Sequence, residues 1–445
     1  MRPFPVAWMK GLGTAGGFAE SVAVRADGSL ILAGRGRPTG WTKRPPSKRT
    51  AAFIAALDAS GGPAWAVELE AADATARAVL ALSDGSAIAC GDFKGTLRVA
   101  GATLATAAGE SDVFVLALGP DGKLRWSTSA GGAGYDSCAD VAALPDGRIV
   151  IAGSVGANAK LGPLTARSQG DGDAFVAQLD ATGAPRWVAT GGSAEQDDAR
   201  ALAVTSDAIY VTGAFGGAAT FGGHALPLPA QTARRVANPS NMFVARYSFA
   251  GDTVWATRFG AASAFDRGWA IAALSDGGVA VAGQTEGRMF VARYSAAGTQ
   301  RWIRTARGDS SAQALLALPD DDVLVAGYFG WPQGGPDLEL SGTTRKLELR
   351  AMGSATVIAR YSGAGELLAA GLLMGDKSHS PGERDGTEVE IMDMARSPAG
   401  RIAMAGRLWF GVAMVSPGDL FVPTTARITV PSEMDTTAVV VLDPP

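Results

Sequence analysis

The chain has 445 residues, of which 47% are hydrophobic and 18% are charged, so it can bury a large core. Its net charge of −4 and its pI of about 5.4 argue against a nucleic-acid-binding protein. No apolar run approaches the roughly 18 residues that cross a bilayer, so we expect no membrane span. The 59 glycines exceed the roughly 7% of an average protein and recur at fixed places, which indicates many tight turns between short strands.

The start of the sequence, MRPFPVAWMKGLG, lacks the apolar stretch and the cleavage site of a signal peptide. Two localisations remain open: the cytoplasm, or the cell envelope or exterior for an exported protein whose leader is not part of this sequence. The first repeat begins without a preceding linker, and for this reason we slightly favour export.

Three sequence elements recur along the chain, seven times each. The first contains small and apolar residues, a turn, and an apolar alternation ending in glycine, and its copies end at Gly34, Gly91, Gly153, Gly213, Gly283, Gly327 and Gly406. The second is an apolar run such as AFVAQLD, whose copies begin at Ala52, Val113, Ala174, Met242, Met289, Thr356 and Thr437. The third is a strand that carries tryptophan at Trp8, Trp65, Trp126, Trp187, Trp255 and Trp302, with a degenerate copy around Leu368 to Leu372.

In chain order, each repeat predicts four β-strands. A D-G turn joins the first two strands as a tight hairpin, and a D-x-x-G turn, as in LDATGAPRW, joins the third and fourth. The runs between the turns alternate with a period of two, and no segment has a helical stripe. Four-stranded units that repeat radially are typical of a propeller. The sequence therefore predicts an all-β fold, a seven-bladed β-propeller of antiparallel blades, in which residues 1–445 form one domain.

The two ends of the sequence predict how this ring closes. The chain begins with a tryptophan strand and ends with TAVVVLD, the element that elsewhere precedes such a strand. We therefore expect the strand around Trp8 to complete the C-terminal blade, which leaves no open sheet edge.

The segment DAFVAQLDATGAPRWVATGGSAEQDD, from Asp173 to Asp198, resembles the bacterial β-propeller repeat family. Units of that family read D-x-F-V-A-x-L-D-x-x-G, then W, then GG and D, and the resemblance covers essentially the whole chain. Members tend to be exported proteins without an assigned activity, so the resemblance implies a propeller and export but no chemistry. LDATGAPRW is also similar to quinoprotein repeats, whose tryptophans dock one blade onto the next. We predict that Asp, Gly and Trp of this motif fix hairpins and pack blades.

The two cysteines are expected near the same rim of neighbouring blades. Cys90 ends the second strand of the second repeat, and Cys138 begins the first strand of the third. A disulfide, which would imply an oxidising compartment, and two reduced buried thiols are both compatible with this placement. The Cα separation below about 7 Å that a disulfide requires cannot be obtained from sequence.

We expect no metal site and no cofactor. His224 and His379 are far apart and lack the spaced cysteines of a zinc site. Two acidic turns, at 170–173 and 319–323, match no calcium loop, and turns are rich in Asp in any case. A basic run at 35–49 can bind an anionic partner but is more typical of a solvated loop.

Propellers usually bind ligands at one mouth of the central channel, and the repeat makes the residues there comparable. Seven residues before the turn Asp, the seven copies contain Glu20, Arg77, Ala139, Arg200, Trp269, Gln313 and Met392. Two residues earlier they contain Phe18, Thr75, Ser137, Asp198, Arg267, Ser311 and Glu390. Nearer the turn, the position is always Ala or Leu. The diversity of the first two positions suits an asymmetric polar ligand, and it equally suits the solvation of an open channel.

The leading hypothesis is a non-catalytic propeller that recognises a small molecule, a glycan or a protein at the channel mouth. The candidate contacts are Phe18, Glu20, Arg77, Asp198, Arg200, Arg267, Trp269, Gln313 and Glu390. The alternative is an enzyme that acts on a small molecule or glycan in the same place, with carboxylates at 20, 198 and 390 as acid/base groups. A purely structural surface protein is the third hypothesis. We expect a monomer with no nucleic-acid partner.

Overall fold

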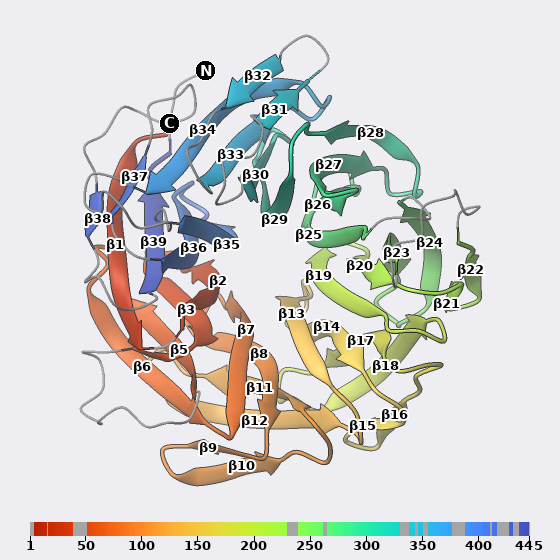
Figure 1. The fold of residues 1–445 in the computed structure, drawn as a ribbon. Helices are drawn as coiled ribbons and strands as arrows, with labels where there is room; N and C mark the ends of the chain where they lie inside the picture. Colours follow the sequence, from red (N-terminus) through yellow and green to blue (C-terminus); the bar gives the residue numbers. More distant parts are fainter. Residues whose placement is uncertain are drawn as a thin grey trace, which may run out of the picture.

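The computed structural model describes residues 4–15, 17–38, 51–228, 239–260, 265–329, 338–342, 346–349, 355–375, 388–409, 412–415, 427–429 and 436–444. Within these residues every regular element is a β-strand, and none is a helix that could cross a membrane. Seven antiparallel sheets are arranged in a ring around a central axis, and an eighth sheet has only two strands (Figure 1). The predicted all-β, seven-bladed propeller is confirmed.

Each blade contains four strands, which follow one another from the axis outward. Blade 1 consists of β2 (Ala19–Val24), β3 (Leu30–Arg35), β5 (Ala51–Leu57) and β6 (Pro63–Glu70). Blade 2 consists of β7 (Asp73–Ala81), β8 (Ala87–Lys94), β11 (Asp112–Leu118) and β12 (Leu124–Gly131). Blade 3 consists of β13 (Ser137–Ala143), β14 (Ile149–Val155), β17 (Asp173–Leu179) and β18 (Pro185–Gly192). Blade 4 consists of β19 (Asp198–Val204), β20 (Ile209–Phe215), β23 (Asn241–Tyr247) and β24 (Thr253–Phe259).

The remaining three blades follow the same order. Blade 5 consists of β25 (Arg267–Ala273), β26 (Val279–Thr285), β27 (Arg288–Tyr294) and β28 (Gln300–Thr305). Blade 6 consists of β29 (Ser310–Ala317), β30 (Val323–Phe329), β33 (Ala355–Tyr361) and β34 (Leu367–Gly375). Blade 7 consists of β35 (Glu388–Arg396), β36 (Ile402–Trp409), β39 (Thr436–Leu442) and β1 (Val6–Ala15).

The ring closes through the two terminal strands. β1 lies beside β39 in Figure 1 and pairs with it in antiparallel register, with Met9 opposite Val440 and Gly11 opposite Ala438. The N-terminal strand is thus the outermost strand of blade 7, as the sequence predicts. This pairing covers the outer edge of β39 and stabilises the closed ring.

Short extra strands link neighbouring blades at the periphery, and the sequence did not predict them. Each follows the second strand of one blade and pairs with the outermost strand of the blade before it. These strands are β4 (Arg37–Pro38), the hairpin β9 (Thr96–Val99) with β10 (Ala102–Thr106), the hairpin β15 (Ala159–Leu161) with β16 (Leu164–Ala166), the hairpin β21 (Ala219–Phe221) with β22 (His224–Leu226), and the hairpin β37 (Val412–Val415) with β38 (Arg427–Thr429). A further hairpin, β31 (Leu338–Ser341) with β32 (Lys346–Leu349), forms a separate two-stranded sheet.

The hydrophobic core lies between the blades. The buried apolar residues form seven clusters, and each cluster joins two adjacent blades, as Ile88 and Cys90 of blade 2 join Ile151 and Phe175 of blade 3. Adjacent blades therefore depend on each other for burial, and the position of the channel is fixed by seven interfaces of the same kind.

Tryptophans dock six of the seven blades onto the next, as the sequence predicts. The indole N–H of Trp126 in blade 2 donates to the carbonyl of Ala181 in the D-x-x-G turn of blade 3, at 3.0 Å. The glycine of that turn, Gly183, lies against the ring, because a Cβ built on it would be 2.5 Å from the indole. The same bond is made by Trp8, Trp65, Trp187, Trp255 and Trp302. In blade 6, Ala369 takes the tryptophan position, and the blade that follows has no D-x-x-G turn there because β39 and β1 are the chain's two terminal strands.

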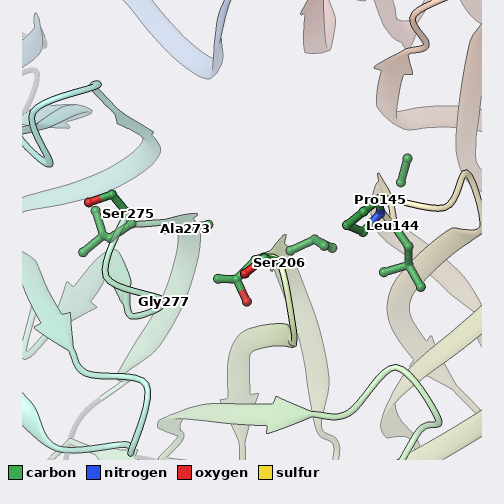
Figure 2. Close-up of a pocket in the computed structure, with 10 residues that line it drawn as sticks. Leu144, Pro145, Ser206, Ala273, Ser275 and Gly277 are labelled. Carbon is green, nitrogen blue, oxygen red and sulfur yellow. The ribbon is translucent and has the colours of Figure 1, made fainter.

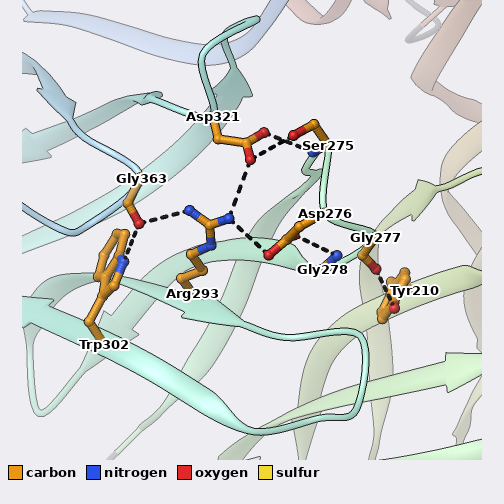
Figure 3. A network of polar contacts seen from close by, with 9 residues as sticks. All are labelled: Tyr210, Ser275, Asp276, Gly277, Gly278, Arg293, Trp302, Asp321 and Gly363. Atoms are coloured by element: carbon orange, nitrogen blue, oxygen red, sulfur yellow. Dashed lines mark hydrogen bonds and ion pairs between the residues drawn. The ribbon is translucent and has the colours of Figure 1, made fainter.

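A polar network at the turn end of the ring joins blades 4, 5 and 6 (Figure 3). Arg293 of blade 5 binds Asp276 of its own blade at 3.0 Å and Asp321 of blade 6 at 3.3 Å, and it donates to the carbonyl of Gly363 at 2.7 Å. Trp302 donates to the same carbonyl at 2.9 Å. On the other side, the hydroxyl of Tyr210 in blade 4 donates to the carbonyl of Gly277 in blade 5, at 2.7 Å (Figure 3).

Candidate functional site

Every innermost strand contains a β-bulge at the same position of the repeat. In blade 2, Ala76 pairs with Gly91 and Ala78 pairs with Cys90, so Arg77 between them has no partner across the ladder. The seven residues skipped in this way are Glu20, Arg77, Ala139, Arg200, Trp269, Gln313 and Met392. They are the diverse position found in the sequence. A bulge turns a side chain out of the normal alternation of a strand, which gives this position a direction of its own.

The glycine that ends each first element makes room for the bulge. Gly91 lies opposite the bulge in blade 2, and a Cβ built on it would be 1.9 Å from the carbonyl oxygen of Thr75. The equivalent distances are 1.9 Å at Gly153, Gly213 and Gly406, 2.0 Å at Gly283, 2.2 Å at Gly34 and 2.3 Å at Gly327. Any side chain at these positions would collide with the backbone of the bulge. The repeated glycine is therefore required by the bulge that the sequence pattern alone did not indicate.

The seven bulged residues line one cavity of about 130 Å³ on the axis of the ring. The residues that follow each bulge complete its wall, and they are Ser21, Ala78, Asp140, Ala201, Ala270, Ala314 and Asp393. Every blade thus contributes to the cavity. Of the nine candidate contacts, the structure brings five together in it: Glu20, Arg77, Arg200, Trp269 and Gln313.

The other four candidate contacts lie two residues earlier, outside the lining of the cavity. Asp198 and Arg267 contact residues of the lining. Phe18 packs between two guanidinium groups, with Arg35 and Arg407 each 4.9 Å from its ring centroid. Glu390 lies near Tyr328. Burial raises the pKa of the Tyr328 phenol, and the negative charge of Glu390 raises it further.

Two arginines lie against the ring of Trp269. The guanidinium carbon of Arg200 is 5.0 Å from its ring centroid and that of Arg267 is 5.1 Å away. Both arginines bind the same carboxylate, Asp198: Arg200 Nη2 donates to Asp198 Oδ2, and Arg267 Nη2 lies 3.9 Å from that oxygen. These two cations and the carboxylate that they share hold the indole at the wall formed by blades 4 and 5.

A second charged group lies at the wall formed by blades 1 and 2. Arg77 Nε donates to Asp92 Oδ1, and Glu20 Oε1 lies 3.9 Å from Arg35 Nε. Burial raises the pKa of Glu20, and the positive charges of Arg77 and Arg35 oppose this rise.

Two acids of the cavity, Asp140 and Asp393, were missed by the sequence analysis. Asp140 of blade 3 accepts the backbone N–H of Leu202 in blade 4 at 2.8 Å, and Asp393 of blade 7 accepts the N–H of Val22 in blade 1 at 2.9 Å. Asp393 also accepts the Ser21 hydroxyl at 2.7 Å. These residues occupy equivalent positions and bridge consecutive blades. The position after the bulge is otherwise alanine or serine, so two aspartates there were a detectable signal.

Solvent exclusion at the axis perturbs both acids. Burial raises the pKa of Asp140 to about 7, although two backbone N–H groups lower it in part, and the charge of Asp393 raises it further. Burial likewise raises the pKa of Asp393 to about 6, against the effect of its N–H and hydroxyl donors. At neutral pH the cavity therefore carries less negative charge than its acidic residues would have in water.

The two cysteines form a disulfide between blades 2 and 3. Cys90 of β8 and Cys138 of β13 have their Cα atoms 5.8 Å apart, and both residues are fully buried. Cys138 directly precedes Ala139, the bulged residue of blade 3. The disulfide thus fixes the backbone next to the cavity.

A larger hollow lies at the other end of the innermost strands (Figure 2). It measures about 470 Å³ and is formed by the hairpin turns of blades 3, 4 and 5, with Pro145, Ser206 and Ser275 among its lining residues. Its lining contains no charged side chain among the described residues. A hollow without charged groups offers little to select a ligand, so the smaller cavity is the better candidate site.

Within the described ranges, no group of three or more His, Cys, Asp or Glu residues is arranged to hold a metal ion. His224 lies in the peripheral β22, where its Nε2 is 3.2 Å from the carbonyl oxygen of Thr253. His379 and the basic residues between Trp41 and Arg49 lie outside the described residues.

No protein-family model matches the chain, so its place in the bacterial repeat family remains a prediction. A stretch of 163 residues, 35% of the chain, is 29% identical to the regulatory protein FlaEY of Caulobacter vibrioides and spans 17% of that protein. Among solved structures, the chain is similar to the RRP9 WD40 repeats (12% identity, 99% of each chain, TM-score 0.37). It is also similar to the exotype rhamnogalacturonan lyase YesX (11% identity, 99% and 91% of the two chains, TM-score 0.34). These similarities are too low to transfer a function.

Proposed function

We propose that this protein is a non-catalytic binding propeller whose axial cavity recognises a small polar ligand. The observation that carries the proposal is the convergence of the seven bulged residues on one cavity. Nearer the turn, the equivalent position of the repeat is always Ala or Leu, since uniform packing is what seven similar interfaces need. The bulged position instead combines two arginines, a glutamate, a glutamine, a tryptophan, a methionine and an alanine. Such a set gives the cavity an asymmetric arrangement of donors, acceptors and apolar groups, as ligand sites have.

The wall of the cavity also offers a ligand a hydrogen-bond donor. The Trp269 indole nitrogen is buried and has no hydrogen-bond partner among the described residues. A buried donor without a partner costs about 1–3 kcal/mol. A ligand that supplies an acceptor would remove this cost.

An enzyme is the second candidate, because carboxylates with raised pKa values are typical of acid/base catalysis. Asp140 and Asp393 have such pKa values, of about 7 and about 6. Their oxygens, however, accept backbone N–H groups of two blades each, and these bonds explain both residues as connections between blades. For this reason binding is the better supported function.

The same end of the ring offers two exposed aromatic side chains. Tyr135 precedes β13 and Phe265 precedes β25 at equivalent positions, and they are 55% and 54% exposed. Lys94 lies 4.9 Å from the ring centroid of Tyr135. Both aromatics support contacts with the part of a ligand that extends out of the cavity.

We also propose that the protein works in an oxidising compartment, which export would provide. The disulfide between Cys90 and Cys138 supports this, because disulfides are rare in the reducing cytoplasm. To test this, the protein is isolated from its native cells, its free thiols are blocked under denaturing conditions, and mass spectrometry determines whether Cys90 and Cys138 carry the blocking group. Blocking of neither cysteine supports it, and blocking of both contradicts it.

A thermal-shift screen against small acids, amines, nucleotides and glycans tests the proposed function. A ligand that binds only the folded protein raises the melting temperature. We expect a hit whose effect is lost in Arg200→Ala and Trp269→Ala and kept in Arg125→Ala, since Arg125 is an exposed arginine bound to Asp84 in blade 2. A hit that persists in the two cavity variants would place binding elsewhere. Turnover of the hit would favour the enzyme.

A further inference from the structure

We infer that the ligand of the axial cavity carries a carboxylate, and that Arg200 and Trp269, which line the cavity, bind it, with the charge of Arg267 beside them. This inference rests on the proposed function and assigns the ligand its chemical class. It follows from the charge balance of the wall between blades 4 and 5, from the unpaired donors there, and from the state of the acids that face this wall.

The wall between blades 4 and 5 has more positive than negative side chains. Arg200 and Arg267 share one carboxylate, Asp198, and both are directed to the same oxygen of it. Two guanidinium groups opposite one carboxylate leave this wall with one positive charge in excess. Burial lowers the pKa of Arg267, Asp198 opposes this, and the positive charge of Arg200 lowers it further, as expected where cations are incompletely neutralised. An anion would complete the neutralisation.

The same wall contains three hydrogen-bond donors without a partner among the described residues. The Nε atoms of Arg200 and Arg267 and the Nε1 atom of Trp269 are buried and have no hydrogen-bond partner among the residues that the structure describes. One acceptor, Asp198 Oδ1, is left over beside these three donors. The wall therefore holds more unpaired donors than unpaired acceptors among the described residues. A carboxylate has two oxygens and about four acceptor positions, and an ammonium group has none.

Three acidic side chains line the other walls of the cavity. Glu20, Asp140 and Asp393 lie on blades 1, 3 and 7, and Arg77 stands beside Glu20. Asp140 and Asp393 each accept hydrogen bonds from the backbone at both oxygens, so they do not compete for the donors of blades 4 and 5. Burial raises the pKa of all three acids, to about 7 for Asp140 and about 6 for Asp393.

These acids couple binding to pH. An anion in the cavity repels their ionised forms, so binding favours their protonated forms and takes up protons. Carboxylate affinity must therefore be higher at pH 6 than at pH 8. A cavity of about 130 Å³ holds several waters, and it has room for a small organic acid such as acetate.

The test is a titration of the ¹⁵N-labelled full chain with sodium acetate at constant ionic strength, followed by the indole N–H signals in NMR. Trp269→Phe assigns the signal of Trp269. We expect this signal to shift downfield and to saturate, with an apparent Kd at least threefold lower at pH 6 than at pH 8. Arg200→Ala should weaken binding at least tenfold, Arg200→Lys less, and Arg125→Ala should leave it unchanged.

Acetamide, ethylammonium and chloride are the matched probes, because acetamide has the shape of acetate without its charge. Saturation by acetamide or ethylammonium but not by acetate would overturn the carboxylate while leaving a ligand-binding cavity in place. A shift with acetate that is linear, or equal to that with chloride, would overturn it as well. If neither these probes nor the thermal-shift panel perturb any residue of the cavity, the proposed function itself fails.

Discussion

Gly91 and Thr75 face each other across the bulge of blade 2, with so little space that a Cβ on Gly91 would lie 1.9 Å from the carbonyl oxygen of Thr75. The same relationship exists in all seven blades. Because a backbone carbonyl cannot move away without loss of the bulge, Gly91→Ala should destabilise the protein by at least about 3 kcal/mol. Chemical denaturation checks this.

Gly147 provides the matched control. It adopts φ of 84° in a hairpin turn, but a Cβ on it would meet no atom within 4 Å. Gly147→Ala should cost only about 1 kcal/mol, through the backbone conformation alone. Equal losses for the two variants would show that the bulge does not need its glycine.

Arg293 should contribute more to stability than an ordinary surface arginine. Its side chain is 13% exposed and binds Asp276, Asp321 and the carbonyl of Gly363. Arg293→Ala leaves two carboxylates and a carbonyl without this donor, so we expect a loss of about 2–3 kcal/mol. Arg125→Ala, whose exposed pair with Asp84 is a simple surface ion pair, should cost less than about 1 kcal/mol. Urea unfolding of both variants would refute this prediction if the losses were equal.

Asp140 should make the protein less stable as the pH rises. Its pKa is about 7 in the fold and near the ordinary value of 3.8 when unfolded, so between these values the folded state holds a proton that the unfolded state has lost. The free energy of unfolding should therefore decrease between pH 5 and pH 7, by on the order of 1 kcal/mol per pH unit. Asp140→Ala, which introduces the residue found at this position in four other blades, should reduce this slope.

Asp84→Ala is the control for the pH experiment. Hydrogen bonds from Ser86 and Arg125 hold the pKa of Asp84 down to about 2, so this group does not titrate between pH 5 and pH 7. Its removal should change the stability but not the slope. A slope that is the same in the wild type and in Asp140→Ala would contradict the raised pKa.

The disulfide should stabilise the interface between blades 2 and 3. Cys90 and Cys138 are 48 residues apart in sequence, so their bond restricts a long segment of the unfolded chain. The double substitution Cys90→Ala with Cys138→Ala should lower the free energy of unfolding by about 2–4 kcal/mol. The double variant should unfold at the same denaturant concentration with and without reductant, whereas the wild type should not. An unfolding transition of the wild type that does not respond to reductant would count against the bond.

The sequence predicted the fold because every local signal was repeated seven times. Turns, strand alternation and tryptophan docking agree in each copy, so an error in one copy does not change the result. The same repetition predicted five of the nine candidate contacts that the structure places in the cavity, since the position of Arg200 in its strand is also that of Trp269 and Gln313.

What the sequence did not predict depends on contacts between blades. The bulge was missed because a glycine at a strand end is also typical of an ordinary turn. Asp140 and Asp393 were missed because their partners are backbone N–H groups of other blades, which no pattern within one repeat contains. The pairing of Arg200 and Arg267 with one carboxylate likewise depends on side-chain conformations. The peripheral hairpins are too short to stand out from loops.

Ala139 offers the most direct test that the axial cavity binds a ligand. It is the smallest of the seven bulged residues and makes no polar side-chain contact, so Ala139→Leu fills part of the cavity without removing a charge. Ala225→Leu, on the exposed peripheral β22, is the control. We predict that every ligand that raises the melting temperature of the wild type and of Ala225→Leu has a much smaller effect on Ala139→Leu. An equal rise in all three proteins would contradict the account, because the ligand would then bind outside the cavity.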